Sequence, residues 1–375
     1  MIFVGIRMAT METNISMHFT YQAPVSDYNG IDYNTGFGQW AVALNGKTVA
    51  KSVEELPTQP TASTAKMILA LAVMEQKPFP LGETGETITI TDELYNIYAK
   101  YVAIGGSVTA VQLGETISEY DALSSALIAS SNNMADTLAI WAFGSLEEYS
   151  NYANEMLIRL GLVNTKVGPD ASGFNETTTS TAADLASIGE IVLKQPVLSE
   201  IVGKTSTTVP VAGLIENTNK ILGTAGIIGV KTGYIGDVSG YCLVSGYKQG
   251  EETVTLAMLG APTRQSSFSS MLELVEKAQN VITTRELVHA GEEVGYYETW
   301  WSGKSSITAS ENISGVVISP AKAELTKNGE TVDDDMELRI ETMETKYATP
   351  VTVAEFPKEP TFWQRFLHVF GWVKQ

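Results

Sequence analysis

The sequence has little cysteine and little histidine, which removes two common kinds of site. The single cysteine, Cys242, cannot form a disulfide within the chain, and it lies in an apolar run from Tyr241 to Val244, so we interpret it as a core residue. The three histidines, His18, His289 and His368, have no helical or hairpin spacing to one another or to the cysteine. The sequence therefore predicts neither a metal site nor a cofactor.

Positive charge is also scarce. Lysine and arginine together number 24, against 43 aspartates and glutamates, and the net charge is -19. Affinity for nucleic acid comes mainly from basic side chains that neutralise phosphates. The charge balance therefore argues against a nucleic-acid partner.

Hydrophobic residues make up 44% of the 375 residues, which is enough for more than one compact domain. We predict an α+β domain, an antiparallel sheet beside a helical lobe, followed by a small β-rich domain and an amphipathic C-terminal helix. An Asn-Gly pair at residues 45–46, between two apolar runs, predicts an early hairpin. The predicted boundaries are 1–35 for an N-terminal lead-in, 36–285 for the α+β domain, 286–356 for the β-rich domain and 357–375 for the tail.

Ser63 and Lys66 are the first candidates for chemistry. A serine hydroxyl is a poor nucleophile unless a base removes its proton, and residues three apart on a helix share a face. The residues from Met67 to Val73 are apolar on every side, which predicts a helix that runs through a core. Apolar surroundings lower the pKa of a lysine, so Lys66 is suited to act as the base.

The Ser-x-x-Lys spacing alone is weak evidence, because it occurs twice more, at Ser245 with Lys248 and at Ser319 with Lys322. Two further elements downstream support Ser63. The segment Ser131-Asn132-Asn133 lies between two predicted helices and can face a cleft, although serine and asparagine there also suit a helix cap. The segment Lys231-Thr232-Gly233 lies on a predicted strand, where lysine and hydroxyl can hold an anion and glycine permits close approach of a ligand.

Together these elements resemble the three motifs of the D-alanyl-D-alanine carboxypeptidases, which are low-molecular-mass penicillin-binding proteins. The likeness covers about Trp40 to Ile282. The segments that carry it are Pro60-Thr61-Ala62-Ser63-Thr64-Ala65-Lys66, Ser131-Asn132-Asn133, Asp170-Ala171-Ser172-Gly173-Phe174, Ser180-Thr181-Ala182-Ala183-Asp184-Leu185, Asn217-Thr218-Asn219-Lys220 and Gly229-Val230-Lys231-Thr232-Gly233-Tyr234.

The resemblance implies a β-lactamase/transpeptidase-like fold and an acyl-transfer cycle on peptidoglycan stem peptides that end in D-Ala-D-Ala. Its catalytic residues would be Ser63, Lys66 and Ser131, and β-lactam antibiotics such as penicillin would acylate Ser63. Binding of the substrate would fall to the following residues: Asn133, Lys231, Thr232, Gly233 and Tyr234. The resemblance also implies an oxyanion hole formed by the backbone amides of Ser63 and Tyr234.

The chain departs from the family pattern in the segment from Asn217 to Lys220. Family members often have an arginine there that assists carboxylate recognition, whereas this segment offers Thr218 or Lys220 in its place. Two alternatives stay open: a class A β-lactamase and a penicillin-recognising sensor without turnover. The β-lactamase would need a deacylating glutamate, and Glu176 lies in roughly the right stretch but in a sequence unlike that loop.

Contact with a membrane is suggested by the C-terminal segment. From Phe362 to Val373, large apolar side chains recur within one helical arc, as in helices that lie in a lipid interface; the alternative is a helix docked on the protein itself. At the other end, the apolar stretch from Met1 to Ile6 is too short for a signal-peptide core. The resemblance nevertheless implies a location in the cell envelope, on the outer face of the cytoplasmic membrane.

Overall fold

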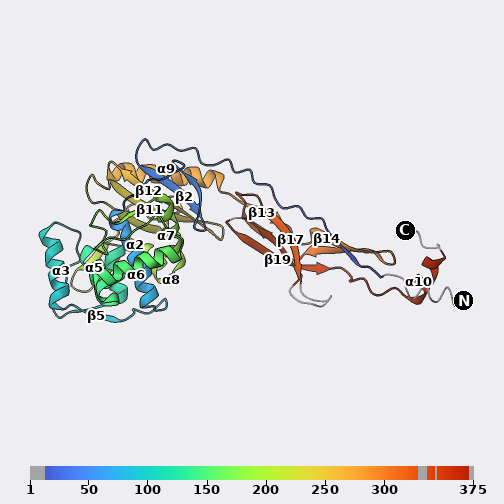
Figure 1. Cartoon of the computed structure of the whole chain (residues 1–375), viewed down its shortest axis with the longest axis horizontal. Helices are drawn as coiled ribbons and strands as arrows, with labels where there is room; N and C mark the ends of the chain where they lie inside the picture. Colours follow the sequence, from blue (N-terminus) through green and yellow to red (C-terminus); the bar gives the residue numbers. More distant parts are fainter. Residues whose placement is uncertain (1–12, 328–335, 343, 371–375) are drawn as a thin grey trace. The chain divides into compact units, whose positions relative to one another are not determined.

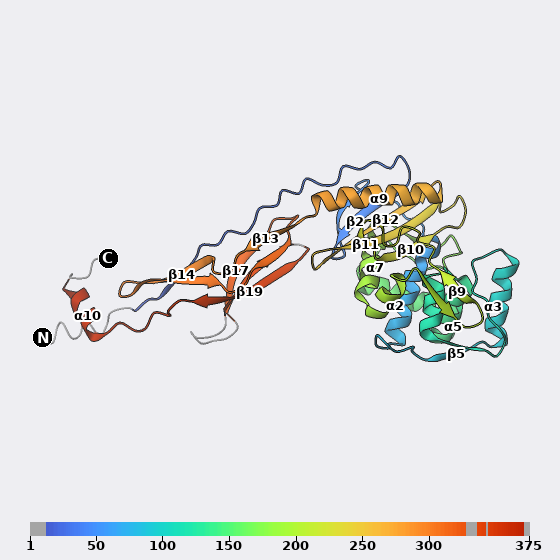
Figure 2. The same ribbon diagram turned by 180° about the vertical axis from the view of Figure 1, so that it is seen from behind.

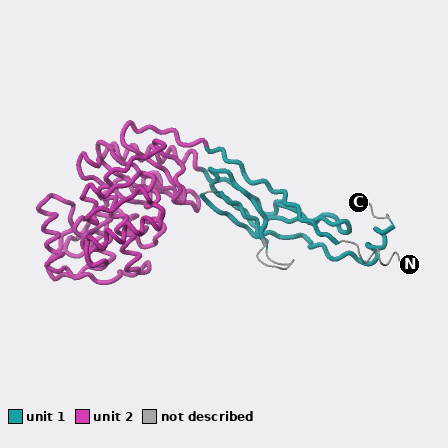
Figure 3. Tube along the Cα trace, viewed as in Figure 1, with its two compact units in different colours: residues 1–28, 283–375 teal, residues 29–282 magenta. Residues whose placement is uncertain are grey.

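The structure, a computed structural model, describes residues 13–327, 336–342 and 344–370 and is shown from two opposite sides in Figures 1 and 2. The chain divides into two compact units (Figure 3). Residues 29–282 form the larger unit, and residues 1–28 together with 283–375 form the smaller one. Each unit is described separately below.

The larger unit combines a five-stranded antiparallel sheet, in the order β10-β11-β12-β2-β3, with a group of helices. Its strands are β2 (Gln39–Leu44), β3 (Lys47–Lys51), β4 (Gln59–Pro60), β5 (Thr87–Thr89), β6 (Thr116–Ser118), β7 (Thr179–Ser180), β8 (Ser206–Val209), β9 (Gly213–Glu216), β10 (Gly229–Gly233), β11 (Tyr241–Gln249) and β12 (Glu252–Ala261). Its helices are η1 (Ala62–Ala65), α2 (Lys66–Gln76), α3 (Asp92–Ala103), α4 (Glu119–Leu127), α5 (Asn132–Phe143), α6 (Leu146–Arg159), α7 (Ala182–Lys194), α8 (Pro196–Val202), η2 (Thr224–Gly226) and α9 (Arg264–Val281).

Helices cover both faces of this sheet, with α9 on one side and α7 on the other (Figures 1 and 2). Behind α7, helix α2 passes through the middle of the unit, and every residue from Lys66 to Met74 is buried. A helix that is apolar all round is stable only inside a core. The prediction of a central buried helix that begins near Ser63 is therefore confirmed.

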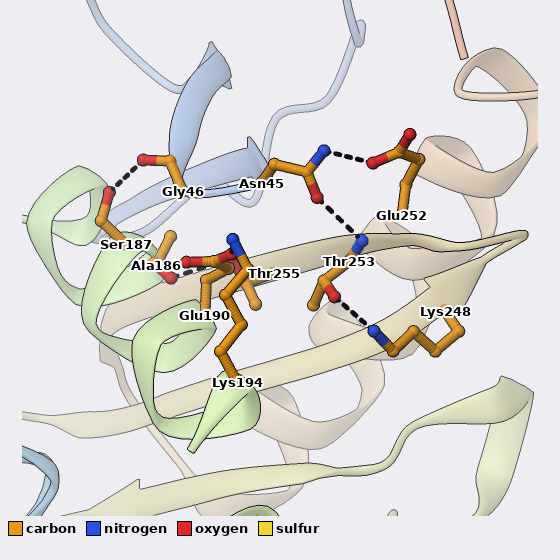
Figure 4. A network of polar contacts seen from close by, with 10 residues as sticks. All are labelled: Asn45, Gly46, Ala186, Ser187, Glu190, Lys194, Lys248, Glu252, Thr253 and Thr255. Atoms are coloured by element: carbon orange, nitrogen blue, oxygen red, sulfur yellow. Dashed lines mark hydrogen bonds and ion pairs between the residues drawn. The ribbon is translucent and has the colours of Figure 1, made fainter. Parts of the chain in front are cut away.

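The hairpin predicted at residues 45–46 is present between β2 and β3, and a polar network joins it to the rest of the sheet (Figure 4). Asn45 and Gly46 both have positive φ, 49° and 80°, as a tight hairpin turn requires. The Asn45 side chain accepts a hydrogen bond from Thr253 N at 3.1 Å, and Ser187 Oγ on α7 donates to Gly46 O at 2.8 Å. These bonds fix the turn against the neighbouring hairpin and against α7.

The smaller unit is built around a six-stranded antiparallel sheet, in the order β1-β14-β15-β19-β18-β17, with a two-stranded pair β13-β16. Its core contains Val294, Ile307, Leu338 and Ile340, which alternate with exposed residues as in a half-buried sheet. Its elements are β1 (Ser16–Phe19), β13 (Thr284–Val288), β14 (Glu293–Thr299), β15 (Gly303–Ala309), β16 (Ile313–Val316), β17 (Lys322–Lys327), β18 (Met336–Glu341), β19 (Lys346–Val353) and α10 (Phe362–Val369).

Two elements were not anticipated. Strand β1, in the segment expected to be a lead-in, pairs with β14 and so joins the smaller unit. Helix α3 was also missed, although Thr91 caps its first turn and Asp92 and Glu93 follow, a typical start signal. Residues 1–12 and 371–375 lie outside the described part of the chain, so the predictions for the apolar start and for the last residues of the tail are not addressed by the structure.

Candidate active site

Ser63 and Lys66 meet where η1 continues into α2. Lys66 is fully buried, and its Nζ donates hydrogen bonds to Ser63 Oγ at 2.7 Å, to Asn132 Oδ1 at 2.8 Å and to the Ser172 carbonyl at 2.7 Å. Three acceptors match the three protons of an ammonium group. When Lys66 loses one of these protons, its lone pair can accept the hydroxyl proton of Ser63.

The protonation of Lys66 is balanced near neutrality. Burial lowers its pKa to about 7, because desolvation disfavours the ammonium form, and the charges of Asp170 and Asp136 act in the opposite direction. A base is most effective when its pKa lies close to the working pH. Lys66 therefore has the neutral form that a base for Ser63 requires.

The backbone around Ser63 is held by close approaches that only glycine permits. A Cβ on Gly173 would lie 2.0 Å from the carbonyl oxygen of Ala62, and a Cβ on Gly233 would lie 3.0 Å from Ser63 N. Ala62 itself has φ 49°, an unfavourable conformation for a residue with a side chain, and such strain is typical of functional sites. Strand β10 and the loop at Gly173 thus enclose the turn that presents Ser63.

Two residues that the sequence analysis did not select complete the cluster around Ser63. Lys231 Nζ donates to Ser130 Oγ at 2.9 Å, and Ser130 lines the same cavity as Ser63. Ser130 has φ 61°, again in the left-handed region. Asn132, at the start of α5, accepts the hydrogen bond from Lys66. Ser130 and Asn132 thus link the two buried lysines.

The structure corrects the register of the second motif, because Ser131 and Asn133 turn away from Ser63. Ser131 is the N-cap of α5, and its Oγ accepts from Met134 N at 3.3 Å and from Thr109 N at 3.0 Å. Asn133 is fully buried and exchanges hydrogen bonds of 3.0 Å with the backbone of Thr109. Both side chains are consumed by helix capping and loop anchoring, so neither is available to a substrate.

The third motif follows β10 into the same cavity. Lys231 is almost completely buried, and burial, with the nearby charge of Lys66, lowers its pKa well below the usual value. Its Nζ also donates to the Thr232 carbonyl at 3.0 Å. The Thr232 hydroxyl shares a hydrogen bond of 2.7 Å with Thr218, whereas Lys220 is exposed and pairs with Glu216. Of the two substitutes considered for the family arginine, the structure places Thr218 in the cavity.

The cavity at Ser63 has a volume of about 150 Å³. Arg264, at the start of α9, lines it and lies over the ring of Tyr241, which in turn stacks on Tyr234 with 4.1 Å between ring centroids. Arg264 is an arginine that the sequence analysis missed, since it lies far along the chain from the expected segment. Its full lining is Ser63, Ser107, Ser130, Thr218, Thr232, Gly233, Tyr234, Tyr241, Cys242, Arg264, Ser267 and Phe268.

A second polar layer lies behind Lys66. Asp136, which is almost fully buried, accepts hydrogen bonds from Tyr101 OH at 2.7 Å and from Ala171 N at 3.1 Å. Burial raises the pKa of Asp136 to about 6. Tyr101 OH also shares a hydrogen bond of 3.1 Å with Ser172 Oγ. This layer ties α3 and α5 to the loop whose carbonyl receives Lys66.

Comparison with known proteins gives the family. Residues 41–263 match the family of D-alanyl-D-alanine carboxypeptidases. The chain belongs to this family. The match contains all the motifs described above except the last residue of interest, Arg264, which follows it directly.

Relatives within the family carry names of more than one activity. The chain is 28% identical over 240 residues to D-alanyl-D-alanine carboxypeptidase DacF of Bacillus subtilis, a match that covers 62% of this chain and 59% of the relative. It is 28% identical over 245 residues to the D-alanyl-D-alanine endopeptidase of Escherichia coli, which covers 62% of this chain and 74% of the relative. The match to DacF thus spans less than two thirds of that relative's length.

Solved structures show the same fold. A mutant of the Streptomyces K15 DD-transpeptidase superposes with a TM-score of 0.59 at 22% identity, covering 66% of this chain and 98% of the other. A peptidoglycan synthesis regulatory factor (PBP3) from Streptococcus pneumoniae gives a TM-score of 0.68 at 17% identity, covering 86% of this chain and 99% of the other. The predicted α+β, transpeptidase-like fold is therefore confirmed.

Proposed function

We propose that the chain is a serine-type D-Ala-D-Ala carboxypeptidase, which removes the terminal D-alanine from peptidoglycan stem peptides through an acyl-enzyme on Ser63. The observation that carries this proposal is the 2.7 Å hydrogen bond between Ser63 Oγ and the buried Nζ of Lys66. A nucleophile within hydrogen-bond reach of a base with a pKa of about 7 is the arrangement that acyl transfer needs.

In the first half of the proposed cycle, Lys66 takes the hydroxyl proton of Ser63, whose oxygen then attacks the carbonyl of the penultimate D-alanine. The backbone amides of Ser63 and Tyr234 stabilise the resulting oxyanion, each worth about 3 kcal/mol of barrier. Ser130 then protonates the leaving amine and regains a proton from Lys231 or Lys66. The peptide bond breaks, D-alanine leaves, and the rest of the peptide stays as an ester on Ser63.

In the second half, water attacks this ester, gives up a proton to the polar cluster, and releases the shortened peptide with Ser63 restored. Lys66 is the group placed to receive that proton, since its Nζ lies 2.7 Å from Ser63 Oγ. A class A β-lactamase would use a glutamate instead. Glu176, the residue considered for that role, is exposed and lines a different hollow, so the β-lactamase reading has no observation in its favour.

The carboxylate of the terminal D-alanine is expected to bind at the hydroxyl pair of Thr232 and Thr218, beside Arg264. Charge-assisted hydrogen bonds are the strong ones, and arginine matches a planar carboxylate. All three residues line the cavity that contains Ser63. A penicillin molecule, with its own carboxylate, would be held in the same way while its lactam carbonyl acylates Ser63.

One experiment separates the candidate activities. The protein is incubated with diacetyl-lysyl-D-Ala-D-Ala and with labelled penicillin, alongside Ser63→Ala. Release of D-alanine together with a long-lived penicillin adduct, both lost in Ser63→Ala, is the expected result. Rapid penicillin turnover would indicate a β-lactamase, and an adduct without any D-alanine release would indicate a sensor.

The same site chemistry serves a carboxypeptidase and an endopeptidase, and relatives bear both names. The arginine at the cavity favours a substrate with a free terminal carboxylate. We therefore expect D-alanine release from linear pentapeptides to exceed cleavage of cross-linked dimers, as measured by chromatography of digested muropeptides. Faster cleavage of the dimers would assign the chain to the endopeptidases.

Location at the outer face of the cytoplasmic membrane, with peripheral contact through residues 362–373, is also part of the proposal. Phe362, Trp363 and Phe370 are 65%, 67% and 47% exposed, and aromatic side chains of this kind bind at lipid interfaces. No helix in the described part of the chain has the length and apolar content to cross a membrane.

The competing interpretation, a helix docked on its own unit, has support in the ring contact of Trp300 with His368 at 4.2 Å. Deletion of residues 362–375 and the milder pair Phe362→Ser with Trp363→Ser should both reduce co-sedimentation with anionic vesicles. Unchanged sedimentation of both variants would remove the membrane proposal and leave the docked helix.

A further inference from the structure

A second hollow, with a volume of about 590 Å³, lies in the larger unit beside the cavity at Ser63. Three segments form it: the end of α3, the loop that follows Asp170, and the turn that follows β10. The residues that matter most to its character are Tyr101, Ile104, Phe174, Glu176, Ile235 and Val238.

Two shared elements place this hollow next to the nucleophile. Ser172 receives Lys66 Nζ at its carbonyl, and its hydroxyl contacts Tyr101 OH at 3.1 Å and Phe174 N at 3.2 Å. Tyr101 and Phe174, which pack edge to face with 5.9 Å between centroids, are walls of the hollow. On the other side, Tyr234 lines the cavity at Ser63 and its chain neighbour Ile235 lines the hollow. A bound peptide that leaves Ser63 therefore reaches the hollow within about one residue, or roughly 3.3 Å of extended chain.

The hollow combines an apolar wall with negative charge. Ile104, Phe174 and Val238 are 50%, 41% and 49% exposed, an unusual amount for large apolar side chains on one small surface. Of its two carboxylates, Asp170 is engaged by backbone amides, from Gly173 at 2.6 Å among others, whereas Glu176 is exposed at the wall.

The remaining charge of the hollow is a cation that has its own aromatic neighbour. The ammonium of Lys100 lies 5.2 Å from the ring centroid of Tyr101. With that group placed over the ring, Glu176 is the charge left to meet a ligand. The surface as a whole therefore suits a long aliphatic chain that ends in an ammonium group.

We propose that this hollow binds the side chain of the diamino acid that precedes D-Ala-D-Ala in the stem peptide, with the aliphatic stem against Phe174 and Val238 and the terminal amine at Glu176. The proposal rests on the proposed function, because the peptide must first place its penultimate carbonyl at Ser63. It assigns to Glu176 a role in substrate selection and none in bond breaking.

The test compares peptides that differ only at the terminal amine of the third residue. Release of D-alanine is measured from peptides ending in lysyl-D-Ala-D-Ala, in diaminopimelyl-D-Ala-D-Ala and in Nε-acetyl-lysyl-D-Ala-D-Ala, for the unmodified chain and for Glu176→Gln. The unmodified chain should prefer the free amines, and Glu176→Gln should reduce that preference about twofold to fivefold, the range of an exposed ion pair. The ratio of kcat/KM values within one enzyme sample does not depend on how much of the variant is folded.

Two controls make the result specific. Glu155→Gln removes an equally exposed glutamate from α6, which does not line the hollow, and should leave the preference unchanged. Phe174→Ala should lower kcat/KM for all three peptides, since they share the aliphatic stem. An unchanged preference in Glu176→Gln while all peptides are cleaved would overturn the subsite alone, whereas absence of D-alanine release from every peptide by the unmodified chain would contradict the proposed function.

Discussion

The cavity at Ser63 and the hollow at Glu176 lie on either side of Ser172, yet their charges are placed in opposite ways. In the cavity, Lys66 and Lys231 are buried, and desolvation lowers the pKa of both. In the hollow, Glu176 is exposed to solvent, where ion pairs are weak. Buried charges are suited to change the protonation of a reacting group, and exposed charges are suited to select among substrates. Substitutions in the two regions should therefore differ both in size and in kind.

The largest effect is expected from Lys66→Met. Loss of the base should lower the rate of acylation by labelled penicillin and kcat/KM for every peptide by about 10²-fold to 10⁴-fold, the range for a general base. Because methionine leaves Asn132 and Ser172 without their donor, thermal unfolding should be measured on the same sample. A folded Lys66→Met protein that acylates at the normal rate would remove Lys66 from the reaction.

The next prediction compares two adjacent serines. Ser130→Ala should slow acylation about 100-fold and change the free energy of unfolding little, because its hydroxyl faces the cavity. Ser131→Ala should instead lower the free energy of unfolding by about 1–2 kcal/mol, through loss of the α5 cap, and leave acylation of the folded fraction nearly unchanged. The reverse pattern in acylation assays and denaturant titrations would restore the register first predicted from the sequence.

An intermediate effect is expected for Arg264, which belongs to the cavity but is exposed like Glu176. Arg264→Ala should raise KM for peptides with a free terminal carboxylate about tenfold, since one charge-assisted hydrogen bond is worth about 1.5–3 kcal/mol when well shielded and less when exposed. The matched control is Lys220→Ala, a cation outside the cavity that pairs with Glu216. Equal changes in KM for the two variants would mean that net charge, not position, is what matters.

Much of this arrangement was predictable from local pattern. The apolar run after Lys66 indicated a buried helix because a surface helix would carry polar residues on one side. Lys231 and Gly233 were found from their place on a strand in a family motif. The hairpin at residues 45–46 followed from the conformational preference of Asn-Gly.

What the sequence left unresolved depends on long-range contacts. The run Ser130-Ser131-Asn132-Asn133 offers two identical Ser-x-Asn spacings, and serine suits both a helix cap and a cleft, so only packing against Thr109 decides which serine caps. Arg264 reaches the cavity because β11 and β12 return the chain to it before α9 begins. The hollow likewise depends on α3, a helix the apolar pattern did not reveal.

The smallest predicted effect concerns Asp136, which lies between the two regions: it binds Tyr101, a wall of the hollow, and its charge acts on Lys66. The negative charge of Asp136 favours the ammonium form, so it raises the pKa of Lys66 against the lowering by burial. Asp136→Asn keeps the shape and removes the charge. The acid limb of kcat/KM for D-alanine release, which should follow the pKa of Lys66 near 7, is then expected to move to lower pH.

The direction of that shift distinguishes electrostatic coupling from simple damage to the fold. Lys66 must be neutral to act as a base, so a lower pKa makes Asp136→Asn relatively more active below pH 7 than at pH 8, by a few fold at most. A merely structural role for Asp136 would lower the whole profile without moving its limb. Asp170 also raises the pKa of Lys66, and its carboxylate anchors the loop at Gly173; Asp170→Asn should therefore shift the limb in the same direction while it also weakens that loop. If neither substitution moves the limb, burial alone sets the base strength of Lys66, and the polar layer behind it serves only to hold the hollow in place.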